Sequence, residues 1–221
     1  MKSISKDNFE NDNFRFSTAK YITIEGIKIW TQRLSYVGEL GYELYVKSEN
    51  AKKIYELLVN KGKDFNLSNC GMHAMDIMRM ESGFLHWGHD ISPEENQYQA
   101  GLSFTISSKK EDEFIGKKAL EKIKKEKIKS RFAMFTLKDS KPGEPLLLHD
   151  EPIYLENKII GRSTSGNYSF NFKKNLTFGY INNDISNDEL HKKDLFIEVE
   201  KKKYPIEMIN KPLKQTNFKN N

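Results

Sequence analysis

The chain has 221 residues, enough for one large domain or two small ones with a buried core. Hydrophobic residues make up 37% of it and charged residues 30%, and the 14 Phe and 10 Tyr argue against a disordered chain. The formal net charge is +5, most of it from lysine, because arginine occurs at only five positions. Proteins that read nucleic acids rely on arginine forks for bases and phosphates. We therefore expect a solvated lysine surface and no nucleic-acid partner.

Targeting signals are not evident in the sequence. It contains no apolar run of about eighteen residues, so no membrane-spanning segment is expected. Its first eight residues lack the apolar core that a secretion signal carries. Cys70 is the one cysteine, which excludes an internal disulfide framework and fits a reducing compartment. Together these features predict a cytoplasmic location.

Two alternating segments near the N-terminus predict a β-hairpin. Residues 21–24 and 27–36 alternate between apolar and polar side chains on either side of Glu25-Gly26. A further short strand is expected at 42–46, after a glycine-rich turn. The N-terminal part is therefore expected to contain an antiparallel sheet.

Apolar residues with helical spacing follow the predicted strands. They predict helices over residues 50–61 and 72–82, each ending next to a glycine. A strand is expected near residues 102–106, within an otherwise irregular stretch. A third helix is predicted over 117–127 and is interpreted as the joint to the next domain.

Beyond Ser130, short apolar segments alternate with Gly, Asn and Asp turns. The expected strands are 132–136, 152–155, 158–164 and 195–199. Short strands at this spacing are typical of a small antiparallel barrel. We predict an α+β protein with a sheet-and-helix domain at 1–128, a C-terminal antiparallel β-barrel at 129–213 and a tail at 214–221.

The turn Gly38-Glu39-Leu40-Gly41 places a carboxylate between two glycines. Glycine lets the backbone bend tightly and lets a ligand approach Glu39 closely. A carboxylate accepts two parallel hydrogen bonds, which suits an aminopyrimidine edge such as that of a pterin. The alternative is a glycine-rich hairpin that merely carries an exposed acid.

One group of residues superficially resembles a zinc site. Cys70 and His73, followed by His86 and His89, have ligand-like spacing, and Asp90 would add a further ligand. No second Cys-x-x-Cys pair or supporting carboxylate motif accompanies them. A structural role is therefore favoured, and no metal is expected.

Two other groups combine charged or aromatic side chains. Asp76 and Arg79 have helical spacing and could pair across one helix face, as a surface pair or an internal ion pair. Trp87-Gly88-His89-Asp90 brings an aromatic plate and polar groups into a loop, an arrangement found in ligand sites and in plain packing.

Signatures of common catalytic and nucleotide sites are missing from the sequence. We find no nucleophile–base pair, phosphate loop or dinucleotide fingerprint. The glycines of residues 161–166 lack the strand–turn–helix context that flavin or nicotinamide binding needs. No catalytic residue is assigned.

Taken in order, several segments resemble one family. Residues 35–46, Ser-Tyr-Val-Gly-Glu-Leu-Gly-Tyr-Glu-Leu-Tyr-Val, resemble the folate-site strand of aminomethyltransferases, in the variant found in dimethylglycine and sarcosine dehydrogenases. Residues 71–81 resemble the helix that follows it. The match continues at 86–91, 100–102, 114–117, 151–153, 161–168 and 178–181. Over residues 14–213 the chain is thus similar to the C-terminal part of the glycine cleavage T-protein family.

The resemblance implies a fold and a set of site residues. It implies a three-lobed arrangement around a central folate hole, with a small β-barrel at the end. Tetrahydrofolate is the implied cofactor, with Glu39 binding the pterin ring and Tyr36 and Gly41 shaping the pocket. Arg79 and Trp87, in the matching helix and loop, are the other candidate folate-binding residues.

Two departures from the family matter. Aminomethyltransferases carry an arginine just before the helix aspartate, where this sequence has Met75, and the dehydrogenase-linked branch tolerates that change. The family's catalytic aspartate and much of its first lobe have no counterpart among these residues, nor has the flavin-binding oxidase domain. By this resemblance the chain is interpreted as a fragment, a split-gene product or one subunit of an assembly.

The resemblance therefore predicts a tetrahydrofolate-binding module that accepts one-carbon units in dimethylglycine or sarcosine oxidation and is inactive alone. Expected partners are folate and either an upstream lobe or a flavoprotein dehydrogenase subunit that holds FAD. Two alternatives stay open. One is a non-catalytic remnant or assembly module that pairs with a flavoprotein, and the other is an aminomethyltransferase in glycine cleavage.

Overall fold

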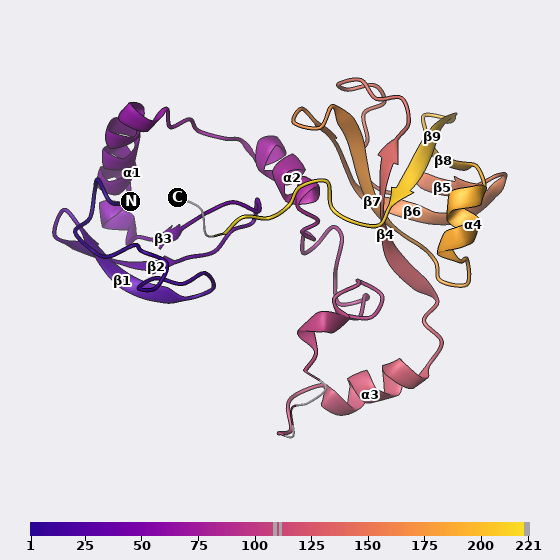
Figure 1. Ribbon diagram of the computed structural model, residues 1–221, viewed down its shortest axis with the longest axis horizontal. Coiled ribbons are helices and arrows are strands. Elements are labelled where there is room, and N and C mark those ends of the chain that lie inside the picture. The colour runs from indigo at the N-terminus through magenta and orange to yellow at the C-terminus, as the bar shows by residue number, and fades with distance from the viewer. Residues whose placement is uncertain (108–109, 111, 219–221) are drawn as a thin grey trace. The chain divides into compact units, whose positions relative to one another are not determined.

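The computed structural model of the chain describes residues 1–107, 110 and 112–218. These residues form two compact units (Figure 1). Unit 1 is Met1–Ser82 together with the C-terminal segment that starts at Lys214, and unit 2 is Gly83–Leu213. Among the helices of the described ranges, none has the length and apolar character that crossing a membrane requires.

Unit 1 contains an antiparallel sheet with the strand order β1-β2-β3. β1 (Ala19–Ile24) pairs with β2 (Ile27–Gln32), which pairs with β3 (Glu43–Tyr45). Glu25 and Gly26 join β1 to β2 with positive φ at both positions, the geometry of a tight hairpin turn. The predicted hairpin is confirmed, although β2 is shorter than expected.

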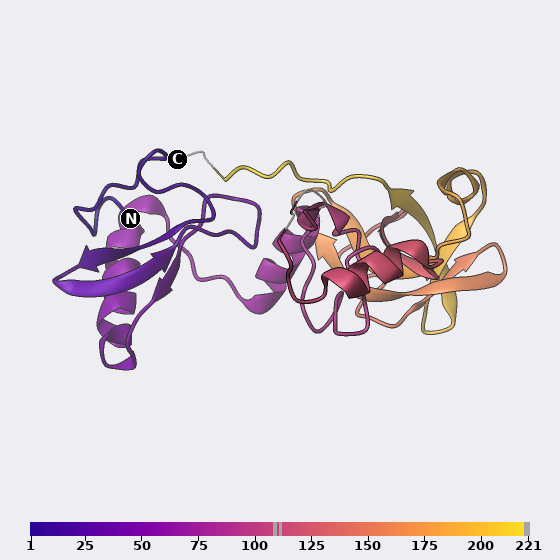
Figure 2. The same cartoon turned by 90° about the horizontal axis from the view of Figure 1, so that it is seen from below.

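Helix α1 (Ser48–Gly62) covers one face of this sheet (Figures 1 and 2). Side chains alternate between the faces of a strand, so Ile22 and Ile24 are buried while Tyr21 is exposed. The buried cluster consists of Phe9, Phe14, Ile22, Ile24, Ile29 and Ile54. Phe9 and Phe14, which precede the first strand, therefore belong to the core of unit 1.

Two further helical segments complete unit 1. The 3-10 turn η1 (Lys63–Phe65) follows α1 directly, and α2 (Met72–Glu81) follows after a short link. α1 and α2 confirm the helices predicted over 50–61 and 72–82.

Unit 2 contains a closed antiparallel barrel with the strand order β4-β7-β6-β5-β8-β9. The strands are β4 (Ser130–Leu137), β5 (Pro152–Leu155), β6 (Lys158–Ser169), β7 (Lys174–Asn182), β8 (Leu195–Val199) and β9 (Lys202–Ile209). Inward side chains such as Phe135, Ile153 and Ile197 are fully buried in one core. The α+β class and the C-terminal antiparallel barrel are therefore confirmed.

Two glycines allow β6 and β7 to lie unusually close together. A Cβ at Gly161 would collide with the carbonyl oxygen of Tyr180, and one at Gly179 would collide with that of Arg162. Both obstacles are backbone atoms, which cannot move aside without separating the strands. Glycine is therefore required at both positions.

Two helices lie outside the barrel wall. α3 (Lys117–Lys125) precedes β4 and confirms the helix predicted over 117–127. α4 (Asn187–Lys192) connects β7 to β8, and the Ser186 side chain caps it by accepting a hydrogen bond from the Glu189 amide (3.1 Å). The domain limits predicted at residues 128 and 213 stay predictions.

The strand expected near residues 102–106 is wrong. The chain there forms a 3-10 turn, η2 (Ser103–Thr105), in which the Thr105 amide donates to the Leu102 carbonyl (3.0 Å). Apolar residues alternate in this segment as they do in a strand, but Phe104 is 81% exposed. A period of two leads to a strand only where a neighbouring strand supplies hydrogen bonds and packing, and no described strand pairs with this segment.

Candidate functional site

The turn between β2 and β3 is held by contacts to its backbone. Gly38 has φ +76°, a value that favours glycine, and a Cβ there would collide with the Ser82 hydroxyl. That hydroxyl donates to the Val37 carbonyl (3.1 Å), and the Glu39 amide donates to the Ser35 hydroxyl (3.0 Å). These contacts fix the backbone from which the Glu39 carboxylate extends.

Gly41 lies at the end of the same turn. A Cβ at Gly41 would collide with the Leu34 carbonyl oxygen, so the chain can fold back here only without a side chain. Tyr36 is half-buried in the turn. The structure thus brings Tyr36, Glu39 and Gly41 together, as a local motif must, and Ser82 joins the turn to the end of α2.

The Glu39 carboxylate pairs with Lys214 of the C-terminal segment. The Nζ atom of Lys214 lies 2.6 Å from Oε1 of Glu39 and 3.4 Å from the Val37 carbonyl oxygen. The side chain of Glu39 is 52% exposed and that of Lys214 is 19% exposed. A carboxylate has two oxygens, and this contact uses one of them. The charged end of Glu39 is therefore partly engaged and still open to solvent.

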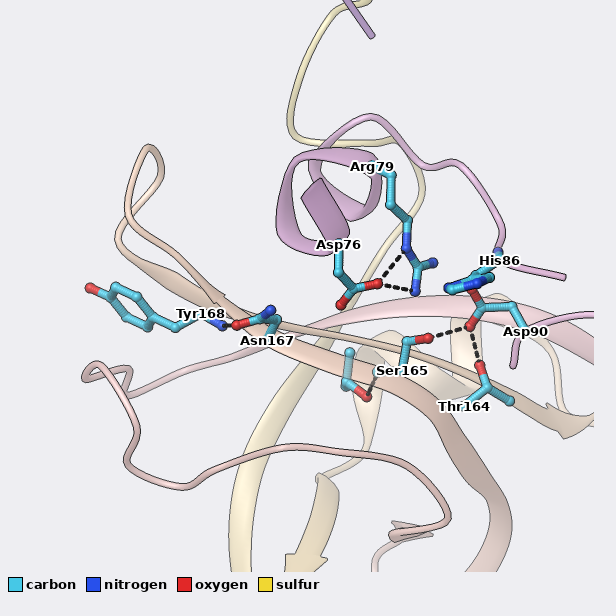
Figure 3. Close-up of polar contacts among 9 residues, drawn as sticks. Asp76, Arg79, His86, Asp90, Thr164, Ser165, Asn167 and Tyr168 are labelled. Carbon is cyan, nitrogen blue, oxygen red and sulfur yellow. Dashed lines mark hydrogen bonds and ion pairs between the residues drawn. The ribbon is translucent and has the colours of Figure 1, made fainter. Parts of the chain in front are cut away.

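Arg79 is almost completely buried and makes an ion pair on its own helix (Figure 3). Its Nε and Nη2 atoms each lie 2.8 Å from Oδ1 of Asp76, whose side chain is 28% exposed. The pairing that helical spacing suggested is thus present in its internal form. The folate contact expected of Arg79 stays a prediction.

Asp76→Asn should destabilise unit 1 by about 1–2 kcal/mol, because a buried guanidinium loses the charge of its paired carboxylate. Urea unfolding in a Trp87→Phe background, followed by the fluorescence of Trp30 in β2, measures this loss. Glu56→Gln is the matched control, because it removes an exposed helix ion pair with Lys52 and should cost less than about 0.5 kcal/mol. Equal losses in the two variants would contradict the buried role of the Asp76–Arg79 pair.

In unit 2, Asp90 is the centre of a buried group of hydrogen bonds (Figure 3). Its carboxylate accepts from the Thr164 hydroxyl (2.6 Å), the Ser165 hydroxyl (2.8 Å) and the His86 amide (2.9 Å). Asp90 itself is 1% exposed. These bonds tie the loop that carries Trp87 to strand β6 of the barrel, while Trp87 is 65% exposed on that loop.

A polar cleft of about 900 Å³ also lies in unit 2, beside His149 and Arg162. Three of its charged or titratable side chains already pair with one another. Asp150 is 2.5 Å from Nη1 of Arg162 and 2.8 Å from Nδ1 of His149. These hydrogen bonds, that of His149 foremost, lower the pKa of the Asp150 carboxyl. We therefore place the candidate ligand site at the Glu39 turn rather than in this cleft.

Among the described residues, no three His, Cys, Asp or Glu side chains gather closely enough to hold a metal ion. Cys70 is exposed, and the Asp90 carboxylate is occupied by the hydrogen bonds described above. Asp90, considered from the sequence as a metal ligand, thus has a structural role in this fold.

Sequence reasoning missed two neighbours of Glu39. Ser82 and Lys214 are far from it in the sequence, and neither belongs to a local motif. Lys214 is one of many lysines in the chain, so its residue type alone does not indicate a role at the site. Only the return of the C-terminal segment to unit 1 reveals it.

A three-stranded antiparallel sheet backed by a helix, followed by a closed six-stranded barrel, defines an α+β protein of two units. The glycine-bracketed turn with its acid belongs to the first unit. Two domain families match this sequence in the same order. "GCVT N-terminal domain" matches residues 1–110, and "Glycine cleavage T-protein C-terminal barrel domain" matches residues 131–214. The chain belongs to the glycine cleavage T-protein family.

Individual relatives agree with this assignment. Mitochondrial dimethylglycine dehydrogenase of Rattus norvegicus is 32% identical over 214 residues, which are 96% of this chain and 24% of the relative. Aminomethyltransferase of Symbiobacterium thermophilum is 33% identical over 167 residues, 75% of this chain and 44% of the relative. The chain thus spans about a quarter of the length of the first and less than half of the second.

A solved structure has the same fold. The glycine cleavage system aminomethyltransferase T from Bartonella henselae superposes with a TM-score of 0.73 at 23% identity. The superposition covers 85% of this chain and 50% of that protein.

Proposed function

We propose that the chain is part of a tetrahydrofolate-binding module that accepts one-carbon units during the oxidation of N-methyl amino acids such as dimethylglycine or sarcosine. Bound tetrahydrofolate would supply the nitrogen atoms that take up the one-carbon unit. The observation that carries this proposal is the half-exposed carboxylate of Glu39, inside the segment that matches the T-protein family. Hydrogen bonds from Ser82 and to Ser35 hold the turn on which this carboxylate lies.

The residues of the turn fit a pterin edge. A pterin presents an amino group and a ring N–H side by side, and the two oxygens of an ionised Glu39 can accept both hydrogen bonds. Gly38 and Gly41 let the backbone bend tightly around the carboxylate, because a side chain at either position would collide with Ser82 or Leu34. We propose that Tyr36 flanks the ring and that Arg79 makes a further contact to the ligand. The folate contact expected of Trp87, which belongs to unit 2, stays a prediction from the sequence.

The chemistry beyond folate binding is assigned to other parts of the assembly. The dimethylglycine dehydrogenase relative is much longer than the segment that matches this chain. We propose that the flavin-dependent oxidation takes place on another domain or on a partner flavoprotein subunit. Residues 1–221 then contribute the folate side of the site and no catalytic group.

Two other functions compete with this one. A non-catalytic assembly module would keep the fold and lose the ligand. An aminomethyltransferase acting in glycine cleavage would bind the same folate but receive its one-carbon unit from a carrier protein, and the 33% identity to an aminomethyltransferase favours it as the second candidate.

Calorimetric titration of tetrahydrofolate into the purified 221-residue chain tests the proposal. We expect saturable binding at a single site. With an aminomethyl-loaded carrier protein as donor, no methylenetetrahydrofolate should form above background, because none of these residues matches the family's catalytic aspartate. Absence of binding, both by this chain and by a variant that lacks the Lys214 ion pair to Glu39, would favour the assembly module. Turnover well above background would show that the chain is an aminomethyltransferase in its own right.

A further inference from the structure

The C-terminal segment Lys214–Phe218, here called the strap, lies along the Glu39 turn within unit 1 (Figure 1). The Lys214 amide donates to the Glu81 carbonyl (2.8 Å), and the Asn217 amide donates to the Gly38 carbonyl (2.8 Å). The strap is therefore held by backbone hydrogen bonds to the end of α2 and to the turn, independently of any ligand.

The far end of the strap is anchored by an aromatic stack and an arginine. The rings of Phe218 and Phe16 stack with centroids 4.1 Å apart and an interplanar angle of 14°. Nη2 of the buried Arg33 donates to the Phe218 carbonyl (3.1 Å), and Nη1 of the same guanidinium donates to the Phe14 carbonyl. The strap thus ends on the core of unit 1, and its course past Glu39 is fixed from both sides.

Between these anchors, Lys214 places its ammonium on the carboxylate that a ligand would use. Nζ of Lys214 lies 2.6 Å from Oε1 of Glu39. A pterin edge needs both carboxylate oxygens at once, since it donates two parallel hydrogen bonds. Each carboxylate oxygen can accept two hydrogen bonds, but the Lys214 ammonium lies beside Oε1 and already uses part of its acceptor capacity, so it competes with the ligand for this oxygen.

We propose that the strap is an internal competitor for the ligand site, with Lys214 as the residue that sets the apparent affinity. This inference rests on the proposed function, because it assumes that Glu39 is the ligand's acceptor. Binding then couples to the opening of the strap. The apparent dissociation constant exceeds the intrinsic one by the reciprocal of the fraction of molecules in which the strap is open.

The test compares tetrahydrofolate binding by the full chain and by Lys214→Met. Methionine keeps the length and apolar stem of lysine but cannot form an ion pair with the Glu39 carboxylate. The affinity for tetrahydrofolate should therefore rise by about three- to fivefold, the range expected from removing a half-exposed ion pair. Lys214→Arg should bind like the parent chain. Lys211→Met is the control for net charge, because Lys211 is exposed and makes no ion pair among the described residues.

Hydrogen exchange of residues 214–218 supplies a readout that does not depend on affinity. Saturating tetrahydrofolate should speed exchange in this segment, and Glu39→Gln should speed it without any ligand, because the strap loses one anchor. An unchanged or weaker affinity in Lys214→Met would overturn the inference and leave the proposed function intact. So would a strap that stays protected at saturation.

Failure of the proposed function gives a different pattern. If neither the parent chain nor Lys214→Met binds tetrahydrofolate, Glu39 is not a folate acceptor. Both the proposed folate binding and the proposed competition by Lys214 are then contradicted. If only Lys214→Met binds, the strap is a strong competitor and both proposals are supported. Thermal melts of every variant distinguish a lost site from an unfolded unit.

Discussion

Asp90→Ala should destabilise unit 2 by about 3–4 kcal/mol, a larger loss than Asp76→Asn should cause in unit 1. The Asp90 carboxylate is buried and accepts hydrogen bonds from Thr164, Ser165 and the His86 amide. Hydrogen bonds to a charged acceptor are worth about 1.5–3 kcal/mol each, and alanine leaves three donors without this acceptor. Asp90→Asn keeps the shape and one oxygen, so it should cost less than the alanine variant.

The fluorescence of Trp87 can follow the unfolding of unit 2, since Trp87 lies on the loop that the hydrogen bonds of Asp90 attach to β6. The chain has two tryptophans, and a Trp30→Phe background leaves Trp87 as the reporter of unit 2. Urea unfolding of Asp90→Ala in that background gives the loss directly. Asp150→Asn is the control, because this aspartate is exposed, its pairs with Arg162 and His149 lie at the surface, and its positive φ suits asparagine. A loss no larger than the control's would contradict the structural role of Asp90.

Local chemistry explains why much of the fold could be predicted from the sequence. Glu25-Gly26 can adopt two successive positive φ values, so the flanking alternation closes into a hairpin. Helical spacing identified α1 and α2, and dense turn residues beyond Ser130 indicated the barrel. In each case the pattern and the tertiary packing favour the same structure.

Prediction failed where distant residues decide the outcome. The segment 102–106 has the alternation of a strand, but its conformation depends on whether a partner strand is present. Asp90 was recognised as a polar loop residue, but its hydrogen-bonding partners lie on β6. The same limit applies to the candidate site: the turn around Glu39 is a local motif, whereas Lys214 reaches it only through the fold of the whole chain.

Glu39→Gln is the decisive substitution at the candidate site. If the carboxylate accepts paired hydrogen bonds from a pterin, glutamine removes the charge and replaces one acceptor by a donor. Losing a charge-assisted pair of this kind should weaken tetrahydrofolate binding by about 2–4 kcal/mol, or about 30- to 700-fold. If Glu39 is merely an exposed turn residue that pairs with Lys214, the variant should change stability by no more than about 0.5 kcal/mol and leave binding unaltered.

Calorimetric titration and thermal melts of both forms separate these outcomes. Glu43→Gln is the matched control, because Glu43 is an exposed acid on the adjoining strand β3 that accepts a hydrogen bond from Tyr45 and should not touch the ligand. In the Glu39→Gln background, Lys214→Met should no longer raise the affinity, because the lysine competes only for the charged carboxylate. A folded Glu39→Gln variant that binds tetrahydrofolate as tightly as the parent chain would remove Glu39 from the site. The ligand contact would then have to be sought elsewhere in the chain, beginning with Arg79.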